Sequence, residues 1–347
     1  MNLKYIKLLI LLLVILSMSY QDGFSGPRRK LGTMAAPELL IPLGSSGTAL
    51  NGSNLASVSG IDAMYWNPAG LSDISSKTGE VMFSHMSYIA DINYEYAAGI
   101  VKLGSLGSLG ASVRSMNFGN GIVVADEDHP DGTGETINPV YLIGTLSYGK
   151  AMTDKIHFGT NVKLISESVG QVSASAIAFD FGLQYIAGSS GLRFGVALKN
   201  LGSSMKFQGS GLDRQYSLNG SQVFRRVTLQ EFDLPTNLEI GLSYGKNFAK
   251  NNNIMISTTF QNSSYSSDQY KFGLEYNYNS MFYLRGAISI YPDQEANEGL
   301  WGPSFGAGIK YPFNGMNVSF DYAYRMINDN STSFNTTNQY FTVGLGF

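Results

Sequence analysis

The chain ends in Gln339-Tyr340-Phe341-Thr342-Val343-Gly344-Leu345-Gly346-Phe347, a stretch that alternates without a break. Every second residue from Phe341 to Phe347 is apolar and the residues between are small or polar, so a strand here has one apolar face. On an exposed edge of a soluble sheet such a strand promotes aggregation. In a closed membrane barrel the last strand pairs with the first, and its apolar face meets lipid. The stretch therefore predicts a transmembrane barrel whose first strand starts near Glu80.

The same alternation recurs along most of the chain, for example over 238–245, 270–278 and 317–325. Further alternating segments begin near Glu80, Ile92, Leu106, Val140, Ile156, Ser173, Leu192, Ile254, Phe282 and Ser304. Together they give about 14 segments of about 10 residues, the length of a tilted membrane-spanning strand. We therefore predict an all-β fold, in which residues 79–347 form a transmembrane antiparallel β-barrel of about 14 strands.

The first 20 residues have the features of a secretory signal peptide. Lys4 and Lys7 precede an apolar run from Leu8 to Leu16, and Ser17-Met18-Ser19 has the small-x-small pattern of a cleavage site. The apolar run is shorter than the roughly 20 residues that a spanning helix needs. We therefore assign residues 1–19 to a signal peptide and expect the mature protein in the outer membrane of a Gram-negative-type cell.

Composition restricts the class of protein. The chain of 347 residues has 40 Gly, 21 Tyr and 20 Phe, only 14% charged residues and a mean hydropathy of -0.03. These values are typical of strands with one apolar and one polar face, whose hydropathies average to near zero, although a large secreted β-sandwich has a similar composition. The absence of Cys excludes disulfides, and the net charge of -3 argues against nucleic acid as a partner.

Charged residues within the predicted strands occur singly among Gly, Ser and Ala, and their signs nearly balance. A lipid-facing surface excludes such side chains, whereas a polar lumen holds them in pairs or hydrated. We therefore expect these residues on the lumen side: Glu95, Arg114, Lys163, Asp180, Arg193, Glu239, Lys271, Glu275, Arg285, Asp321 and Arg325. The many glycines between them leave room for another element inside the barrel.

Connections differ in length. Gly188–Gly191 and Phe313–Gly315 are short, as periplasmic turns are, and we assign Gly119–Asn138, Gly202–Asp233 and Met326–Asn338 to the extracellular side. The first of these longer segments contains an acidic cluster of Asp126, Glu127, Asp128 and Asp131. Its spacing does not match an EF-hand loop, so we favour a solvated loop over a Ca²⁺ site.

Residues 20–78 do not alternate, and we predict that they form a plug in the lumen. The segment is too apolar for a disordered tail and too interrupted for strands. Asn67-Pro68 favours a turn, beside which Trp66 packs, and Ala69-Gly70 permits close approach of the backbone. The candidate site residues of the plug are Tyr65, Trp66, Asn67, Pro68, Ala69 and Gly70.

The plug resembles a known superfamily. An Asn67-Pro68-Ala69 turn in an N-terminal hatch before the predicted strands is similar to the FadL family of outer-membrane transporters of hydrophobic compounds. The blocks Leu31–Pro37, Gly47–Ala56 and Tyr65–Leu71 resemble the PorV/PorQ branch of that superfamily more closely. This resemblance implies a FadL-like barrel. For the PorV/PorQ branch it also implies a role in type IX secretion, where such barrels receive cargo proteins from a translocon.

Catalytic motifs are weak. Gly241–Gly245 matches the letters of a nucleophile elbow but lies within an alternating strand instead of a strand-turn-helix. His85, His129 and His157 are far apart and share no ligand spacing. A membrane-embedded Ser/His lipase that uses His85 or His157 is an alternative, but packing of these histidines is favoured. We predict no enzyme, no cofactor, and no catalytic or metal-binding residues.

Two functions remain. In the first, the barrel binds a secretion translocon and cargo proteins, and the long outer segment Gly202–Asp233 binds the cargo. In the alternative, hydrophobic small molecules contact Leu39, Leu40, Ile41 and Leu43 and leave by a plug movement or a gap in the wall. An open porin is disfavoured by the plug. In each case the barrel contacts outer-membrane lipid, and the terminal Phe347 resembles the signal read by the outer-membrane assembly machinery.

Overall fold

The structure is a computed structural model that describes residues 33–88, 92–218, 221–292, 301–327 and 337–347. The predicted signal peptide, residues 1–19, lies outside the described residues, as does most of the predicted outer segment Met326–Asn338. Among the described residues, no helix is long and apolar enough to span a membrane.

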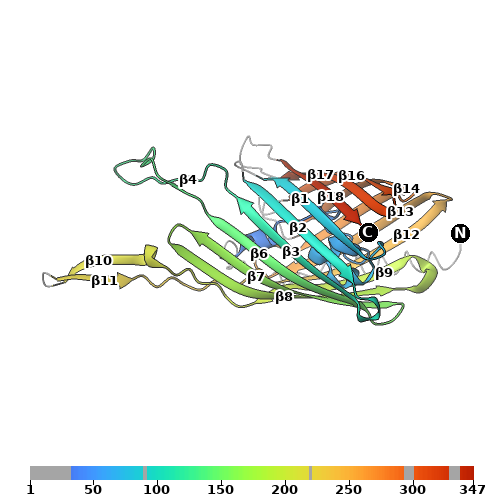
Figure 1. Cartoon of the computed structure of the whole chain (residues 1–347), viewed down its shortest axis with the longest axis horizontal. Coiled ribbons are helices and arrows are strands. Elements are labelled where there is room, and N and C mark those ends of the chain that lie inside the picture. The colour runs from blue at the N-terminus through green and yellow to red at the C-terminus, as the bar shows by residue number, and fades with distance from the viewer. Residues whose placement is uncertain (1–32, 89–91, 219–220, 293–300, 328–336) are drawn as a thin grey trace.

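The chain forms a closed antiparallel barrel of 14 strands (Figure 1). The order around the barrel is β1-β18-β17-β16-β15-β14-β13-β12-β9-β8-β7-β6-β3-β2. The strands are β1 (Gly79–Ser87), β2 (Asn93–Lys102), β3 (Ser108–Asn117), β6 (Val140–Ala151), β7 (Ile156–Val169), β8 (Val172–Ile186), β9 (Leu192–Gly202), β12 (Asn237–Ala249), β13 (Asn252–Ser263), β14 (Gln269–Tyr278), β15 (Phe282–Ile290), β16 (Trp301–Phe313), β17 (Met316–Ile327) and β18 (Thr337–Gly346).

The barrel closes through its terminal strand. β18 pairs with β17 on one side and β1 on the other, with Val81 opposite Leu345 and Phe83 opposite Val343. The carbonyl of Phe347 accepts hydrogen bonds from the backbone N–H groups of Thr78 and Gly79, at 2.7 and 3.0 Å. The predicted barrel of about 14 strands, closed near Glu80, is confirmed.

The two faces of the strands differ in polarity. On β12, Leu238, Ile240 and Tyr244 are exposed on the outer wall, whereas Glu239 and Ser243 are buried toward the lumen. The same alternation runs along β7 and β8, where every second residue is buried. The barrel therefore has the apolar exterior and polar interior of an outer-membrane-type barrel.

One lumen assignment is wrong. Glu95 lies on the outer wall, because the buried residues of β2 are its neighbours Tyr94 and Tyr96. These aromatic residues face inward because this part of the lumen holds apolar plug residues, and the Tyr94 hydroxyl donates to the carbonyl of Glu38 at 3.3 Å. Glu95 instead accepts from the Nδ1 of His85, directly across the strand pair, at 2.7 Å.

The two ends of the barrel have different connections. One end carries short turns, including the three-residue elements η5 (Gly104–Leu106) and η6 (Gly188–Ser190). The other carries the hairpins β4–β5 (Ile122–Val123 and Thr136–Ile137) and β10–β11 (Asp213–Leu218 and Ser221–Arg226), with η7 (Ser210–Leu212) before β10. β10–β11 projects well beyond the barrel (Figure 1). The rule for outer-membrane barrels, in which the longer loops are extracellular, predicts that the long-loop end faces the outside of the cell.

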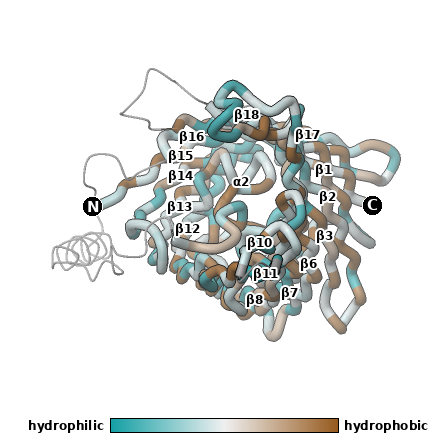
Figure 2. Tube along the Cα trace, turned by 90° about the vertical axis from the view of Figure 1, so that its left-hand side faces the viewer, coloured by the Kyte–Doolittle hydropathy of each residue, from teal (hydrophilic) through white to brown (hydrophobic). Residues whose placement is uncertain are grey.

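The segment before β1 lies inside the barrel as a set of short helices. They are η2 (Pro37–Leu40), α2 (Ser45–Ala49), η3 (Gly60–Asp62), α3 (Ala63–Trp66) and η4 (Pro68–Ser72). Figure 2, which looks onto the long-loop end, shows α2 within the ring of strands. Their apolar side chains form a core with inward residues of β1, β2, β17 and β18. We refer to residues 33–78 as the plug.

Lumen glycines form the seat of the plug. Gly159 is paired with Gly149 on β6 and with Gly182 on β8, so three glycines lie side by side on the inner wall. A Cβ on Gly159 would lie 2.1 Å from the carbonyl oxygen of Pro68. The glycines leave room inside the barrel, as expected, and the plug fills it, so that the backbones of wall and plug are in contact.

Candidate functional site

A cavity of about 370 Å³ lies in the long-loop half of the lumen, above the plug. We call it the vestibule. One side is the segment from Pro37 to Pro42, which is apolar except for Glu38, and the floor is formed by Tyr65 and Trp66. Four aromatic residues complete its walls, two within strands and two just after the ends of β1 and β15: Tyr141, Trp301, Tyr88 and Tyr291. The vestibule therefore has the apolar and aromatic lining that is typical of small-molecule sites.

The predicted ligand contacts fall into two groups. Leu39, Leu40 and Ile41 line the vestibule. Leu43 lies in the plug core, where its carbonyl accepts a hydrogen bond from Trp66 Nε1 at 3.1 Å. Contact between a ligand and any of these residues stays a prediction.

The floor is fixed by packing of Trp66. Its indole lies against Gly47 and Gly52, where an added Cβ would come within 2.0 and 2.4 Å of ring atoms. Tyr65 packs edge-on against the same indole, with ring centroids 4.8 Å apart and planes at 89°. Because both rings are held this way, the floor of the vestibule is a rigid aromatic surface.

The turn after Trp66 attaches the floor to the wall. The side-chain amide of Asn67 donates to the carbonyl of Leu55 in the plug at 3.0 Å and to the carbonyl of Leu183 on β8 at 3.4 Å. Its Oδ1 accepts from the N–H of Ala69 at 3.2 Å. The latter contact caps η4. At Gly70, a Cβ would lie 2.1 Å from the carbonyl oxygen of Val58. The structure brings Tyr65 through Gly70 together as the element that seats the plug.

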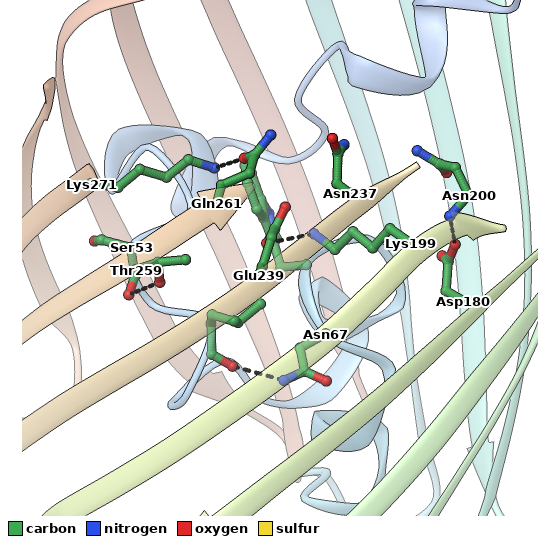
Figure 3. Close-up of polar contacts among 12 residues, drawn as sticks. Ser53, Asn67, Asp180, Lys199, Asn200, Asn237, Glu239, Thr259, Gln261 and Lys271 are labelled. Carbon is green, nitrogen blue, oxygen red and sulfur yellow. Dashed lines mark hydrogen bonds and ion pairs between the residues drawn. The ribbon is translucent and has the colours of Figure 1, made fainter. Parts of the chain in front are cut away.

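A buried ion pair lies beside the floor. Lys199 Nζ is 3.1 Å from Glu239 Oε2, and it also lies 5.4 and 5.6 Å from the ring centroids of Tyr65 and Trp66 (Figure 3). The carboxylate and the aromatic faces together compensate for burial of the ammonium group. The next lysine along the wall, Lys271, donates to Gln261 Oε1 at 2.6 Å.

A bulge in β9 positions Lys199. The β8–β9 register shifts between Phe179 and Phe181, and Asn200 has a φ of 60°. Its N–H donates to Asp180 Oδ1 at 2.8 Å (Figure 3), and its side-chain oxygen accepts from Lys163 at 2.7 Å. Lys163 also pairs with Asp180 at 2.7 Å, so the bulge is held by a buried polar network.

Unpartnered polar groups gather on the opposite wall. Arg325 lies over the ring of Trp301 at 4.1 Å, and it is only 3% exposed. Within the described residues, no hydrogen-bond partner is present for its Nε and Nη1, for both polar side-chain atoms of Asn338, or for the Tyr340 hydroxyl. Buried polar groups in this condition favour a polar ligand atom or water beside them.

The wall next to Trp301 is partly unpaired. β15 and β16 pair from Phe282 opposite Ile309 to Ala287 opposite Ser304, and no pair is recorded beyond this point for the described residues Ile288–Ile290. Here β16 has a register shift against β17, and Pro303 has no N–H to donate. We call this opening toward the long-loop end the β15–β16 seam. It adjoins the vestibule at Tyr291 and Trp301.

Burial also changes two plug carboxyls. It raises the pKa of Asp62 to about 6, although the Ser46 hydroxyl donates to this carboxylate at 2.6 Å. It raises the pKa of Glu38 above its usual value despite the nearby Arg114. Both groups are thus more easily kept protonated than in water.

The histidines do not form a common site. His157 Nδ1 is 2.5 Å from the Ser72 hydroxyl, which itself donates to the Ala69 carbonyl, so the contact fixes the end of η4. His129 pairs with Asp126 at 2.9 Å in the acidic outer turn. In the part of the chain that the structure describes, no three His, Asp or Glu side chains come together as metal ligands do.

Sequence reasoning allowed for a gap in the wall and for glycines that leave room in the lumen, but it missed the positions of both, namely the β15–β16 seam and the glycine seat. Pro303 was the available signal for the seam, because proline is unfavourable inside a paired strand. The seat had no readable signal, since Gly149, Gly159 and Gly182 become neighbours only through strand register.

We compared the sequence and the structure of this chain with those of known proteins. No protein-family model matches the sequence, and no curated protein matches it. Among solved structures, the CymD monoaromatic hydrocarbon channel matches with a TM-score of 0.54 at 14% identity, over 89% of this chain and 98% of that one. The Pseudomonas putida toluene transporter TodX matches with a TM-score of 0.53 at 13% identity, over 88% of this chain and 97% of that one. This chain therefore has the fold of these two structures, which are outer-membrane barrels of the FadL family.

The likeness extends over most of both chains, since this chain covers 98% and 97% of the two similar structures. At these identities the likeness concerns the fold. No comparison supports the finer PorV/PorQ assignment.

Proposed function

We propose that this protein is an outer-membrane channel for hydrophobic small molecules. The observation that carries the proposal is the vestibule, which joins an apolar and aromatic lining to an unpaired stretch of barrel wall. The solved structures with this fold are named as a hydrocarbon channel and a toluene transporter, which supports the same class of ligand. This was the alternative function drawn from the sequence.

The proposed route avoids the plug. A compound enters the vestibule from the long-loop end, where it leaves water for the surfaces of Leu40, Ile41 and Trp66. Straight passage would require displacement of a plug that is seated backbone to backbone on the wall. The β15–β16 seam offers a path to the bilayer between Ile288 and Pro303, which would be opposite each other if the pairing continued.

Cysteine cross-linking tests the route, because the chain has no native Cys. Ile288→Cys and Pro303→Cys place two thiols across the seam, and a short bis-methanethiosulfonate joins them through two disulfides, which a reductant cleaves. In liposomes containing the purified protein, we expect the cross-link to abolish uptake of N-phenylnaphthylamine and reduction to restore it. The matched control is Gly286→Cys with Phe305→Cys, which are opposite each other in the paired part of the same two strands. Equal uptake with and without the seam cross-link would contradict the route, and no uptake by the unmodified protein would contradict the function.

The secretion role remains a second hypothesis. It draws on the resemblance of Tyr65–Gly70 to the PorV/PorQ branch, but these residues already have a role in seating the plug. The feature that favours it is the projecting β10–β11 hairpin (Figure 1). Deletion of the gene tests this role: surface cargo should remain undelivered, and normal secretion would argue against it.

A further inference from the structure

The two outer hairpins carry opposite charges. β10–β11 contains three arginines, Arg214, Arg225 and Arg226, and one acid, Asp213. The turn of β4–β5 contains the acidic residues Asp126, Glu127, Asp128, Asp131 and Glu135. In a chain with a net charge of -3, the basic hairpin is a local exception.

One face of β10–β11 has uncompensated charge. Arg214 lies directly opposite Arg225, whereas on the other face Asp213 pairs with Arg226 at 2.7 Å. Like charges directly opposite each other across a strand pair are destabilising. Within the described part of the chain, no ion pair is present for Arg214 or Arg225. This face of the hairpin is therefore positively charged and would be stabilised by a bound anionic group.

The same face also carries apolar surface. Tyr216 lies opposite Val223, two residues along from the arginine pair, and these side chains are 49% and 37% exposed. A two-stranded hairpin alone is marginally stable in water, and β10–β11 stands clear of the barrel (Figure 1). Exposed Tyr beside Arg is a combination that is enriched at the centres of protein interfaces.

The acidic turn is a complementary surface. Asp126 is engaged within the turn, where it accepts from the N–H groups of Asp128 and His129. Glu127, Asp128 and Asp131 are exposed, and no ion pair is present for them among the described residues. The turn can thus present three carboxylates to a partner.

We propose that the β10–β11 hairpin of one barrel docks on the acidic β4–β5 turn of a second copy of this chain. The two hairpins diverge within one molecule (Figure 1), so the complementary surfaces do not satisfy each other there. A membrane holds neighbouring barrels parallel, which brings the hairpin of one copy to the height of the turn of the next. Because each copy carries both surfaces, the contact either joins two copies reciprocally about a two-fold axis or continues from copy to copy into rings or rows of barrels.

Charge reversal tests the contact. The full chain, labelled with donor or acceptor dye in liposomes, should show energy transfer between copies at 50 mM salt and several-fold less at 500 mM, since salt screens the exposed charges. Arg214→Glu with Arg225→Glu should abolish transfer, and so should Asp128→Arg with Asp131→Arg. Mixing these two variants should restore it, because each hairpin then meets a turn of opposite charge.

A matched control changes the same charge elsewhere. Lys155→Glu with Lys250→Glu alters two exposed lysines at the short-turn end and should leave transfer unchanged. Heat-modifiable gel migration checks that every variant is folded. The proposal is overturned if wild-type copies show no transfer at low salt, if the reversed hairpin associates normally, or if mixing fails to restore transfer.

Discussion

Single lumen glycines determine where the plug rests. At Gly159 and Gly182 the missing side chain allows the Asn67–Ala69 turn to touch the strand backbone. At Gly159 the opposing atoms belong to the backbone of Pro68 and Ala69, and at Gly182 the nearest one is the side-chain oxygen of Asn67, which is itself hydrogen-bonded, so neither contact leaves space for adjustment. The position of the vestibule floor therefore depends on the absence of single methyl groups.

Gly159→Ala should displace the plug. The new methyl group would collide with the carbonyl of Pro68, and overpacking of this kind costs about 1–3 kcal/mol. We expect lower thermal stability and larger single-channel currents in planar bilayers. Gly144→Ala is the matched control, because a Cβ there meets nothing within 4 Å. Equal behaviour of the two variants would show that the seat is not needed.

Asp62 should make plug stability depend on pH. Its folded pKa of about 6 lies above its usual value of 3.8, so the folded plug binds a proton more tightly than the unfolded chain. The stability of the plug is therefore greatest below pH ~4 and falls as the pH rises to about 6, by at most about 3 kcal/mol in total. Above pH ~6 this contribution stays constant.

Asp62→Asn should remove this dependence and stabilise the plug at pH 7, because the amide still accepts from Ser46. Urea titrations in a Trp301→Phe background, followed by Trp66 fluorescence, measure the effect at each pH. Glu127→Gln, which changes an exposed carboxyl in the outer turn, serves as control. An unchanged slope between pH 4 and 6 in the Asp62→Asn variant would refute the assignment.

At the scale of the element, strands were predictable because their signal is local. Alternation along β12 or β18 reports directly which face meets lipid, since lipid accepts apolar side chains and little else. The rule failed at Glu95 because the inner face of β2 contacts an apolar plug and not water. The bulge at Asn200 and the β15–β16 seam were missed because both depend on the partner strand.

Pro303→Thr should close part of the seam. Threonine restores an N–H donor and favours strands, and one added hydrogen bond contributes about 1 kcal/mol. We expect higher thermal stability and slower uptake of N-phenylnaphthylamine. Pro312→Thr, at the opposite end of β16 where pairing with β17 is complete, should leave uptake unchanged. Faster uptake by the Pro303 variant would contradict a lateral route.

At the scale of the whole molecule, Phe347 links the last strand of the barrel to the start of the first. Its backbone N–H and carbonyl both bond to Gly79, and Thr78 adds a further bond. The sequence predicted this closure, because an apolar strand at the end of a chain requires a partner. It did not predict the vestibule, whose lining comes from Met34 to Arg325 and is assembled only when the barrel closes.

Deletion of Phe347 should impair membrane insertion. The change removes the closing backbone hydrogen bonds and the terminal aromatic ring, so we expect a several-fold loss of protein from the outer-membrane fraction. Phe347→Tyr keeps the backbone contacts and an aromatic ring, and it should insert normally. Equal amounts of the deletion variant and wild type in that fraction would show that the terminal residue is dispensable.

The glycine seat also has a kinetic consequence. The plug comes before every strand in the chain, yet it rests on β6, β7, β8 and β16, whose seat residues follow it by roughly 80 to 260 positions. The surface that it recognises is absent until those strands are aligned. The plug, although it is synthesised before the strands, therefore reaches its final position only after they have aligned, and until then the vestibule has no floor.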